Sequence, residues 1–143
     1  MPIPVLLVDD NPNDALLIEE AFRDAGRVCI VQHVSSGDEC LAYLRRQKPY
    51  EHAASPELIL MDVNMPGRDG FQVLRDLKAD PRFARLPVVM LTSSVRTEDV
   101  DSAYAAGAAS FVVKPLTFDQ LQRVAQEFAA YWADVAKVPS PAL

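Results

Sequence analysis

The sequence has only two cysteines in 143 residues, and none of its apolar runs approaches the ~20 residues that a membrane-spanning helix needs. Cys29 and Cys40 lie inside apolar patterns without the spacing of a metal site, which predicts buried structural thiols rather than a disulfide or a ligand pair. The N-terminus lacks the basic and apolar stretches of a signal peptide. These absences disfavour a membrane protein or a disulfide scaffold and predict a cytoplasmic location.

Basic residues are also scarce, with 14 lysines and arginines against 20 aspartates and glutamates, for a formal net charge of −6. Direct binding to nucleic acid needs a basic surface that neutralises phosphates, so this class is disfavoured. Half of the residues are apolar, which is typical of a globular protein. The length predicts one domain over residues 1–137, followed by a flexible C-terminal tail over residues 138–143.

Four apolar runs, each expected to form a buried strand, stop on polar residues. The runs are residues 5–8, 58–61, 88–91 and 111–113, and the polar residues that follow them are Asp9 with Asp10, Asp62, Thr92 and Lys114. A further strand is expected over residues 28–34, which are dominated by β-branched side chains.

Helical spacing of apolar residues follows each of the five strands. The expected helices lie over residues 15–22, 36–46, 71–80, 97–106 and 117–135. Ser36, Thr97 and Thr117 are the expected N-caps, and residues 47–57 are expected to form a long loop. Strict alternation of strands and helices predicts a three-layer α/β domain, with a parallel sheet between two layers of helices.

The carboxyl ends of parallel strands share one edge of the sheet, where ligands bind. This edge should gather three aspartates, a threonine and a lysine from distant parts of the sequence. Clustered carboxylates repel one another unless a cation offsets their charge, and Mg²⁺ prefers such oxygen ligands. With Lys114 and the Thr92 hydroxyl as donors to a phosphoryl group, the pattern predicts that an aspartate accepts phosphate.

Taken singly, each of these residues also has an ordinary structural explanation. Asp10 is of the type that caps helices or forms turns, and a threonine or lysine at a strand end is usually solvated. His33 and His52 have no partner at a metal-site spacing, and both are expected to be structural or exposed. The combination of such residues at four strand ends favours a phosphoacceptor and metal site over a separate structural explanation for each residue.

The sequence resembles the receiver domain of two-component response regulators from Val5 to about Trp132. The stretches that carry the resemblance are Val8-Asp9-Asp10-Asn11, the run from Leu60 to Gly70, Leu91-Thr92-Ser93 and Val113-Lys114-Pro115. The resemblance implies a flavodoxin-like, doubly wound (βα)5 fold with strand order 2-1-3-4-5.

The resemblance also implies roles at the acidic edge. Asp62 would be the phosphoacceptor, and Asp10 and Asp62 would bind Mg²⁺ through their carboxylates. The main-chain carbonyl of Asn64 would complete the protein ligands, and Asp9 would act mainly through a metal-bound water. The chain would be no enzyme beyond catalysing its own aspartyl phosphorylation and dephosphorylation.

Three further roles follow from the same resemblance. Thr92 would be the switch hydroxyl, Lys114 the salt-bridge partner of the phosphoryl group, and Phe111 the aromatic switch residue. The Lys114–Pro115 bond would be cis. Asn64 and Ser94 stand at the variable positions that influence how long the phosphoryl group survives.

A narrower resemblance concerns the partners. The run from Asp10 to Ala15 and the 47–57 loop are similar to those of single-domain regulators that partner bacterial phytochrome histidine kinases. The resemblance implies a stand-alone switch whose fourth helix, fifth strand and fifth helix form its output face. Aromatic residues near the end of the last expected helix favour a homodimer through this face, although plain packing explains them equally well; they are Phe128, Tyr131 and Trp132.

Three alternatives remain open at this point. A phosphatase of the haloacid dehalogenase type needs Asp-x-Asp-x-Thr after the first strand, where this chain has Asp9-Asp10-Asn11-Pro12-Asn13. An FMN-binding flavodoxin needs a Ser/Thr/Gly phosphate cradle after the first strand, which is missing. A receiver-like module that no longer accepts phosphate is disfavoured because every residue of the predicted site is present.

Overall fold

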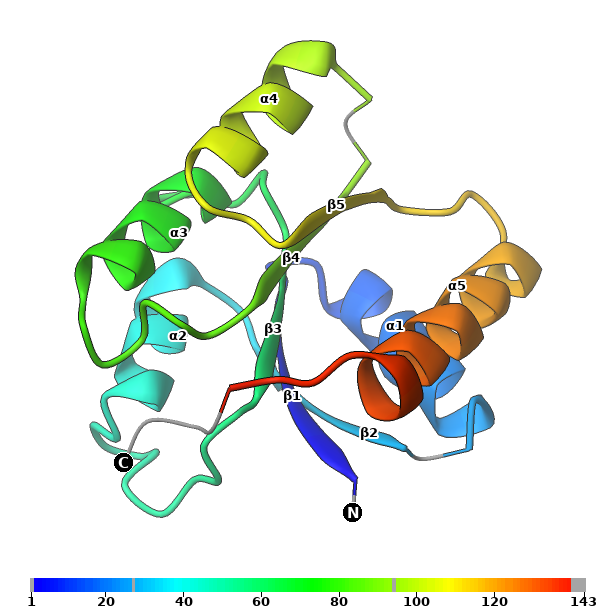
Figure 1. Ribbon diagram of the computed structural model, residues 1–143, viewed down its shortest axis with the longest axis horizontal. Helices are drawn as coiled ribbons and strands as arrows, with labels where there is room; N and C mark the ends of the chain where they lie inside the picture. The colour runs from blue at the N-terminus through cyan, green and yellow to red at the C-terminus, as the bar shows by residue number, and fades with distance from the viewer. Residues whose placement is uncertain (1, 27, 94, 140–143) are drawn as a thin grey trace.

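In the computed structural model, residues 2–26, 28–93 and 95–139 are described. The described residues form one parallel sheet in the order β2-β1-β3-β4-β5, as expected (Figure 1). The strands are β1 Ile3–Val8, β2 Cys29–Val34, β3 Leu58–Met61, β4 Val88–Thr92 and β5 Ser110–Val113. The helices are α1 Pro12–Asp24, α2 Gly37–Leu44, α3 Gly70–Ala79, α4 Thr97–Ala105 and α5 Phe118–Ala130, which continues into the π-helical turn η1 Tyr131–Val135.

The helices cover both faces of the sheet. Helices α2, α3 and α4 lie over one face, and α1 and α5 lie over the other (Figure 1). Each face has its own apolar cluster, and on the second face the rings of Phe22 and Phe128 join α1 to α5 with centroids 5.4 Å apart. This is the predicted three-layer α/β architecture.

Strand β3 shows why the strands of this sheet lack an apolar-polar alternation. Ile59 and Met61 belong to the cluster under α2, α3 and α4, whereas Leu58 and Leu60 belong to the cluster under α1 and α5. Because successive side chains point to opposite faces, a strand covered on both faces must be apolar throughout. The next residue, Asp62, is therefore the first position of this segment at which a polar side chain reaches the edge of the sheet.

Polar side chains cap most of the helices. Ser36 and Thr117 are N-caps, as predicted, and their hydroxyls accept hydrogen bonds from Glu39 N–H (3.1 Å) and Gln120 N–H (3.2 Å). The prediction for Thr97 is wrong, because the extended residue before α4 is Arg96 (φ −73°, ψ 134°) and Thr97 already has helical geometry. Ser/Thr followed by acidic residues marks the start of a helix but does not fix which backbone position is extended.

The segment over residues 47–57 contains no helix or strand, in line with the expected loop. It starts after α2, where Arg46 has a left-handed backbone (φ 56°), and contains a cis bond between Lys48 and Pro49. None of the helices in the described part of the chain combines the length and the apolar character that are needed to span a bilayer. Of the tail, residues 138 and 139 are described and residues 140–143 lie outside the described residues, so its flexibility stays a prediction.

Both thiols are buried, as predicted, and burial raises the pKa of Cys29 to about 11 and that of Cys40 to about 12. Because the thiolate is the reactive form, neither cysteine of the native protein should react with an aromatic disulfide reagent at pH 8 within minutes. Both should react in denaturant, and absorbance of the released thiolate counts them. One equivalent released from the native protein would contradict the buried placement.

Candidate phosphoacceptor and metal site

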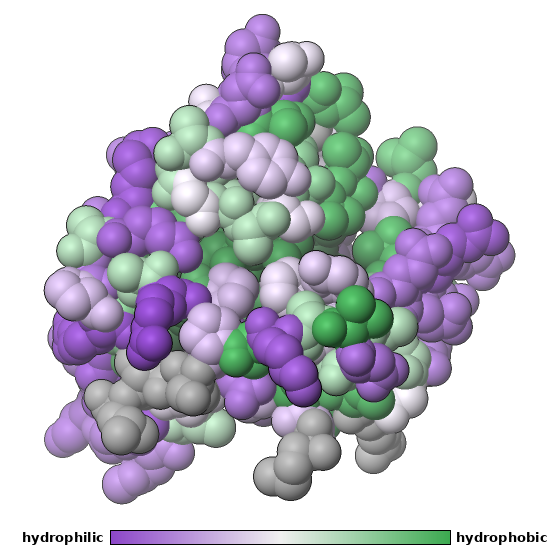
Figure 2. Space-filling model, in the orientation of Figure 1, coloured by the Kyte–Doolittle hydropathy of each residue, from purple (hydrophilic) through white to green (hydrophobic). Residues whose placement is uncertain are grey.

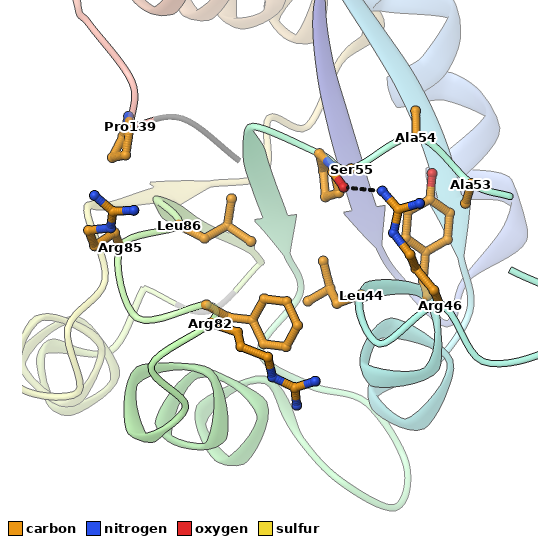
Figure 3. A pocket seen from close by; sticks show the side chains of 12 residues that line it. Leu44, Arg46, Ala53, Ala54, Ser55, Arg82, Arg85, Leu86 and Pro139 are labelled. Atoms are coloured by element: carbon orange, nitrogen blue, oxygen red, sulfur yellow. Dashed lines mark hydrogen bonds between the residues drawn. The ribbon is translucent and has the colours of Figure 1, made fainter. Parts of the chain in front are cut away.

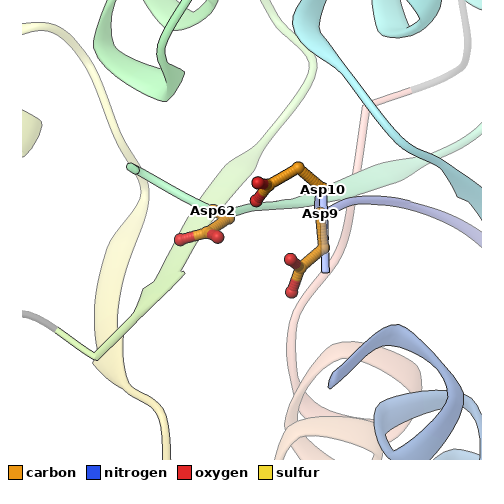
Figure 4. Close-up of side chains that lie close together, drawn as sticks. All are labelled: Asp9, Asp10 and Asp62. Atoms are coloured by element: carbon orange, nitrogen blue, oxygen red, sulfur yellow. The ribbon is translucent and has the colours of Figure 1, made fainter. Parts of the chain in front are cut away.

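Three aspartates meet at the carboxyl edge of the sheet. Asp9 and Asp10 follow β1, and Asp62 follows the neighbouring strand β3, in which Met61 is in register with Val8. One carboxylate oxygen from each aspartate lies within 4.8 Å of the other two (Figure 4). Asp9 is 1% exposed and Asp62 is 7% exposed, while Asp10 is the most open of the three. The strand order thus brings together side chains that stand about 50 positions apart in the printed sequence.

Lys114 is the cation of this cluster. Its Nζ lies 2.8 Å from Asp9 Oδ2, 3.1 Å from Asp14 Oδ2 and 3.5 Å from Asp62 Oδ2. The backbone N–H of Lys114 donates to the Thr92 carbonyl at 2.7 Å, which joins the ends of β5 and β4. One ammonium group therefore offsets part of the charge of three carboxylates.

The Asp62 carboxyl is held in an environment that disfavours its charge. Burial is the largest cause, and the nearby charges of Asp9 and Asp10 act in the same direction. Lys114 and the backbone N–H of Asn64, which lies 3.3 Å from Asp62 Oδ1, act in the opposite direction. The result is an Asp62 pKa raised to about 6. The carboxylate is therefore ionised at neutral pH, and its negative charge is only partly offset by its surroundings.

The pKa of Lys114 is raised. Burial by itself would lower the pKa of this amine, but the hydrogen bond to Asp9 and the charges of Asp62 and Asp9 outweigh burial. Lys114 is thus fully protonated at neutral pH and is available as a fixed positive charge beside Asp62.

Two contacts in the site were not predicted from the sequence. Asp14, in the first turn of α1, shares the Lys114 ammonium, and His33 Nε2 lies 2.8 Å from the backbone carbonyl of Asp9. His33 thus has a partner at the site, whereas its sequence context showed none. Asp14 stands three residues after Asn11, the N-cap of α1. The position at which this cap starts the helix therefore determines the side of α1 on which Asp14 lies. Neither contact has a sequence signal, because both depend on how separate elements pack.

The remaining predicted residues differ in their burial. Thr92 is fully buried at the end of β4, and Phe111 of β5 is partly buried against the α2–α4 cluster. Asn64 is exposed in the turn after β3. Ser94, one of the two positions tied to phosphoryl lifetime, lies outside the described residues.

The expectation of a cis Lys114–Pro115 bond is wrong, because the cis bond found in the described residues is Lys48–Pro49. The trans form is the intrinsically favoured state of a bond to proline, and the Lys114 side chain reaches Asp9 and Asp62 with this bond trans.

The donor set fits a hard divalent cation. Three carboxylates supply oxygen atoms, and two of the three are largely buried, so the cluster carries more negative charge than Lys114 balances. Mg²⁺ and Mn²⁺ prefer such oxygen ligands and usually keep positions for water or phosphate oxygens. Asp10, the most exposed of the three aspartates, is the ligand at which water or phosphate oxygens can approach such an ion.

The fold and this acidic edge define a class of protein. The family model described as "Response regulator receiver domain" matches residues 5–126, and the chain belongs to this family.

Several relatives are similar over nearly the whole chain. Response regulator Rcp1 of Synechocystis is 30% identical over 97% of this chain and 95% of its own length. The protein described as "Probable methanogenesis regulatory protein FilR2" of Methanothrix harundinacea is 35% identical over 99% of this chain and 90% of its own length.

Solved structures show the same likeness. The phosphorylated cyanobacterial phytochrome response regulator RcpA has a TM-score of 0.90 and 34% identity, with coverage of 98% of this chain and 100% of the other. The Mn²⁺-bound form of Rcp1 has a TM-score of 0.87 and 30% identity, with coverage of 97% of this chain and 100% of the Rcp1 chain. This chain is thus a receiver domain similar in extent to single-domain phytochrome response regulators.

Proposed function

We propose that this chain is the phosphoacceptor of a two-component phosphorelay and takes a phosphoryl group from a histidine kinase onto Asp62. The observation that carries the proposal is the placement of Lys114 against Asp62 and Asp9, with the oxygens of Asp9, Asp10 and Asp62 within 4.8 Å of one another. This is the combination of nucleophile, fixed cation and metal ligands that phosphoryl transfer needs.

In the proposed transfer, an oxygen of the Asp62 carboxylate attacks phosphorus, the O–P bond forms, and the N–P bond to the donor histidine breaks. The imidazole leaves with the electron pair of that bond. A bound Mg²⁺, held by Asp10, Asp62 and the Asn64 carbonyl, would neutralise charge on the phosphoryl oxygens. Lys114 supplies a second positive charge from the Asp9 side, where it already lies 3.5 Å from Asp62 Oδ2.

The proposed output uses Thr92 and Phe111. The Thr92 hydroxyl closes on the phosphoryl group, Phe111 reorients, and the face formed by α4, β5 and α5 changes its preference for partners, including a second copy of the chain. Exposed apolar side chains on these elements and their flanking loops support a binding role for this face; they are Val95, Tyr104, Val113 and Leu116.

The proposed donor is the kinase domain of a bacterial phytochrome. Support comes from the likeness to Rcp1 and RcpA, which extends over nearly the full length of this chain and of each of those two proteins. The absence of direct nucleic-acid binding, the cytoplasmic location and the domain boundary at residue 137 stay predictions of the same proposal.

Incubation with acetyl phosphate and Mg²⁺ should add one phosphate, about 80 Da by intact mass. Chelation of the metal should reduce the extent of phosphorylation at least about tenfold, because the charge on the phosphoryl group is then uncompensated. The Asp62→Asn variant should take up none. Asp101→Asn, a change at an exposed aspartate in α4, is the matched control and should behave as the parent. Equal phosphorylation of Asp62→Asn and the parent would refute the assignment.

Transfer from a phytochrome-type histidine kinase is a separate test. A purified, autophosphorylated kinase of this type should lose its label to the parent chain and not to Asp62→Asn. If acetyl phosphate labels Asp62 but no such kinase does, the acceptor assignment stands and the phytochrome assignment fails.

A further inference from the structure

Strand β2 forms one edge of the sheet, and half of its backbone groups point away from the molecule. The Asp9 N–H donates to the Val34 carbonyl at 3.1 Å. The backbone N–H and C=O groups of Val34 and the other even-numbered residues of β2 therefore point towards β1. In a parallel ladder the intervening residues turn their backbone groups the opposite way. Cys29, Val31 and His33 therefore present three N–H donors and three carbonyl acceptors along the open edge.

Nothing in the described residues covers or guards this edge. The outward groups have no hydrogen-bond partner among the described residues, and the strand keeps one unbroken register against β1 from Cys29 to Val34. The sequence of β2, Cys-Ile-Val-Gln-His-Val, has no lysine, acid or proline. Natural edge strands are usually protected by charges, proline or bulges, so β2 is an open template for another strand.

The surroundings of the edge are apolar. Ile30 is 42% exposed on β2, and Val28, just before the strand, is also exposed. A groove of about 250 Å³ runs between α1 and β2, and its lining residues are Glu19, Phe22, Arg23, Cys29, Ile30 and Val31. A strand added to this edge would bury these apolar atoms as well as satisfy the backbone.

We propose that β2 pairs antiparallel with β2 of a second copy of this chain, which joins two five-stranded sheets into one continuous sheet. With a twofold axis at Val31, this residue lies opposite the partner's Val31, and Cys29 lies opposite the partner's His33. These are the residues with outward backbone groups, so every one of those groups finds a partner. Like charges opposite each other would oppose pairing, and this register places none opposite each other.

The flanking charges favour a second copy over an unrelated strand. Glu19 and Arg23 lie four residues apart and line the same groove beside β2. The twofold axis sets α1 of the two copies side by side and antiparallel, so that Glu19 faces the partner's Arg23 and Arg23 faces the partner's Glu19. A patch with one acid and one base in this order is complementary to itself. This interface lies at the edge opposite β5 and is separate from the α4–β5–α5 face.

Sedimentation over a concentration series tests the pairing with two matched variants. Ile30 on β2 and Val113 on β5 are equally exposed, at 42%, on opposite edges of the sheet. Ile30→Lys should weaken association through β2 at least about tenfold, because it places two lysines in the paired edge. Val113→Lys should leave the same association intact.

The proposal is overturned if Ile30→Lys associates like the parent, if the parent sediments as a monomer up to about 1 mM, or if Val113→Lys alone abolishes all association. If both faces associate, the parent should exceed the mass of a dimer, and each variant should stop at the dimer formed by the other face. That outcome supports the β2 interface.

A covalent trap gives an independent measurement. Opposed residues of a hydrogen-bonded antiparallel pair have Cα atoms about 5.5 Å apart, which is within disulfide range. Val31→Cys should therefore form a disulfide-linked dimer under mild oxidation, whereas Arg75→Cys, at an exposed position of α3 outside both proposed faces, should give little. Circular dichroism verifies the fold of each variant. A folded Val31→Cys chain that associates but never crosslinks would exclude this register.

Discussion

Replacing Gly70 with alanine should lower the free energy of unfolding by about 3 kcal/mol, because the new methyl group has no room. A Cβ at position 70 would lie 2.3 Å from the backbone carbonyl oxygen of Asp62 and 3.0 Å from Val63 Cα. Both neighbours are backbone atoms, which cannot rotate away as a flexible side chain does. The Gly70 N–H also donates to the Val63 carbonyl at 3.0 Å, so the first turn of α3 is tied directly to the turn after β3.

The cost of this clash should extend to phosphorylation. To make room, either α3 must move outward or the peptide that carries Asp62 must rotate, and the second change displaces the carboxylate from Lys114 and the other aspartates. We expect slower labelling by acetyl phosphate in the fraction of Gly70→Ala that stays folded, in addition to the lower urea midpoint.

Gly26→Ala is the matched control for Gly70→Ala. Gly26 has a left-handed backbone (φ 98°), and apart from its two chain neighbours no described residue lies within 4 Å of a Cβ added there. Its substitution should cost only the backbone strain of a non-glycine residue, about 1 kcal/mol, with no effect on phosphorylation. If urea unfolding shows Gly70→Ala to be as stable as Gly26→Ala, the packing of α3 against the Asp62 turn is not as tight as the structure indicates.

The predictions from the sequence succeeded where a local signal combines with a general rule. Each apolar run that stops on a polar residue is visible in the sequence, and the rule that parallel strands end at one edge brings Asp9, Asp62 and Lys114 together. The close approach at Gly70 had no such signal. It depends on the angle at which α3 leaves the β3 turn, and a glycine after an aspartate is equally typical of an ordinary turn.

The contacts of His33 and Asp14 were missed for a similar reason. His33 reaches the Asp9 carbonyl only because β2 pairs with β1 in a register that sets residue 33 beside Leu7. Asp14 reaches Lys114 only because α1 starts at Pro12, one turn earlier than its apolar spacing indicates. Periodicity identifies elements well, but their exact ends and their relative placement follow from packing.

Replacing Lys114 with alanine should destabilise the metal-free protein by about 3 kcal/mol at pH 7.5, since it leaves buried carboxylates without their cation. The Lys114 side chain is 14% exposed, and its ammonium lies 2.8 Å from Asp9 and 3.5 Å from Asp62, whose side chains are largely buried. Lys137→Ala, at an exposed lysine, is the control and should change stability by less than about 0.5 kcal/mol.

The effect should depend on pH in a defined direction. The pKa of Asp62 is about 6 in the folded protein, above its ordinary value of 3.8, so protonated Asp62 adds stability below pH 3.8 that is lost as the pH rises through 6. Lys114 acts to lower this pKa, and its removal should shift the loss to still higher pH. The difference between the parent and Lys114→Ala should therefore be largest above pH 7 and shrink towards pH 4.

Two rescues would identify repulsion among the carboxylates as the cause. In the Lys114→Ala background, Asp62→Asn removes one of the crowded charges and should restore most of the lost stability. Saturating Mg²⁺ should narrow the gap to the parent, because a cation held by the same carboxylates compensates the charge that Lys114 leaves behind. Urea unfolding at pH 4, 6 and 7.5, with and without Mg²⁺, measures all of these differences. A loss of stability that is the same at every pH and insensitive to both rescues would mean that Lys114 acts through packing of its aliphatic stem rather than through its charge.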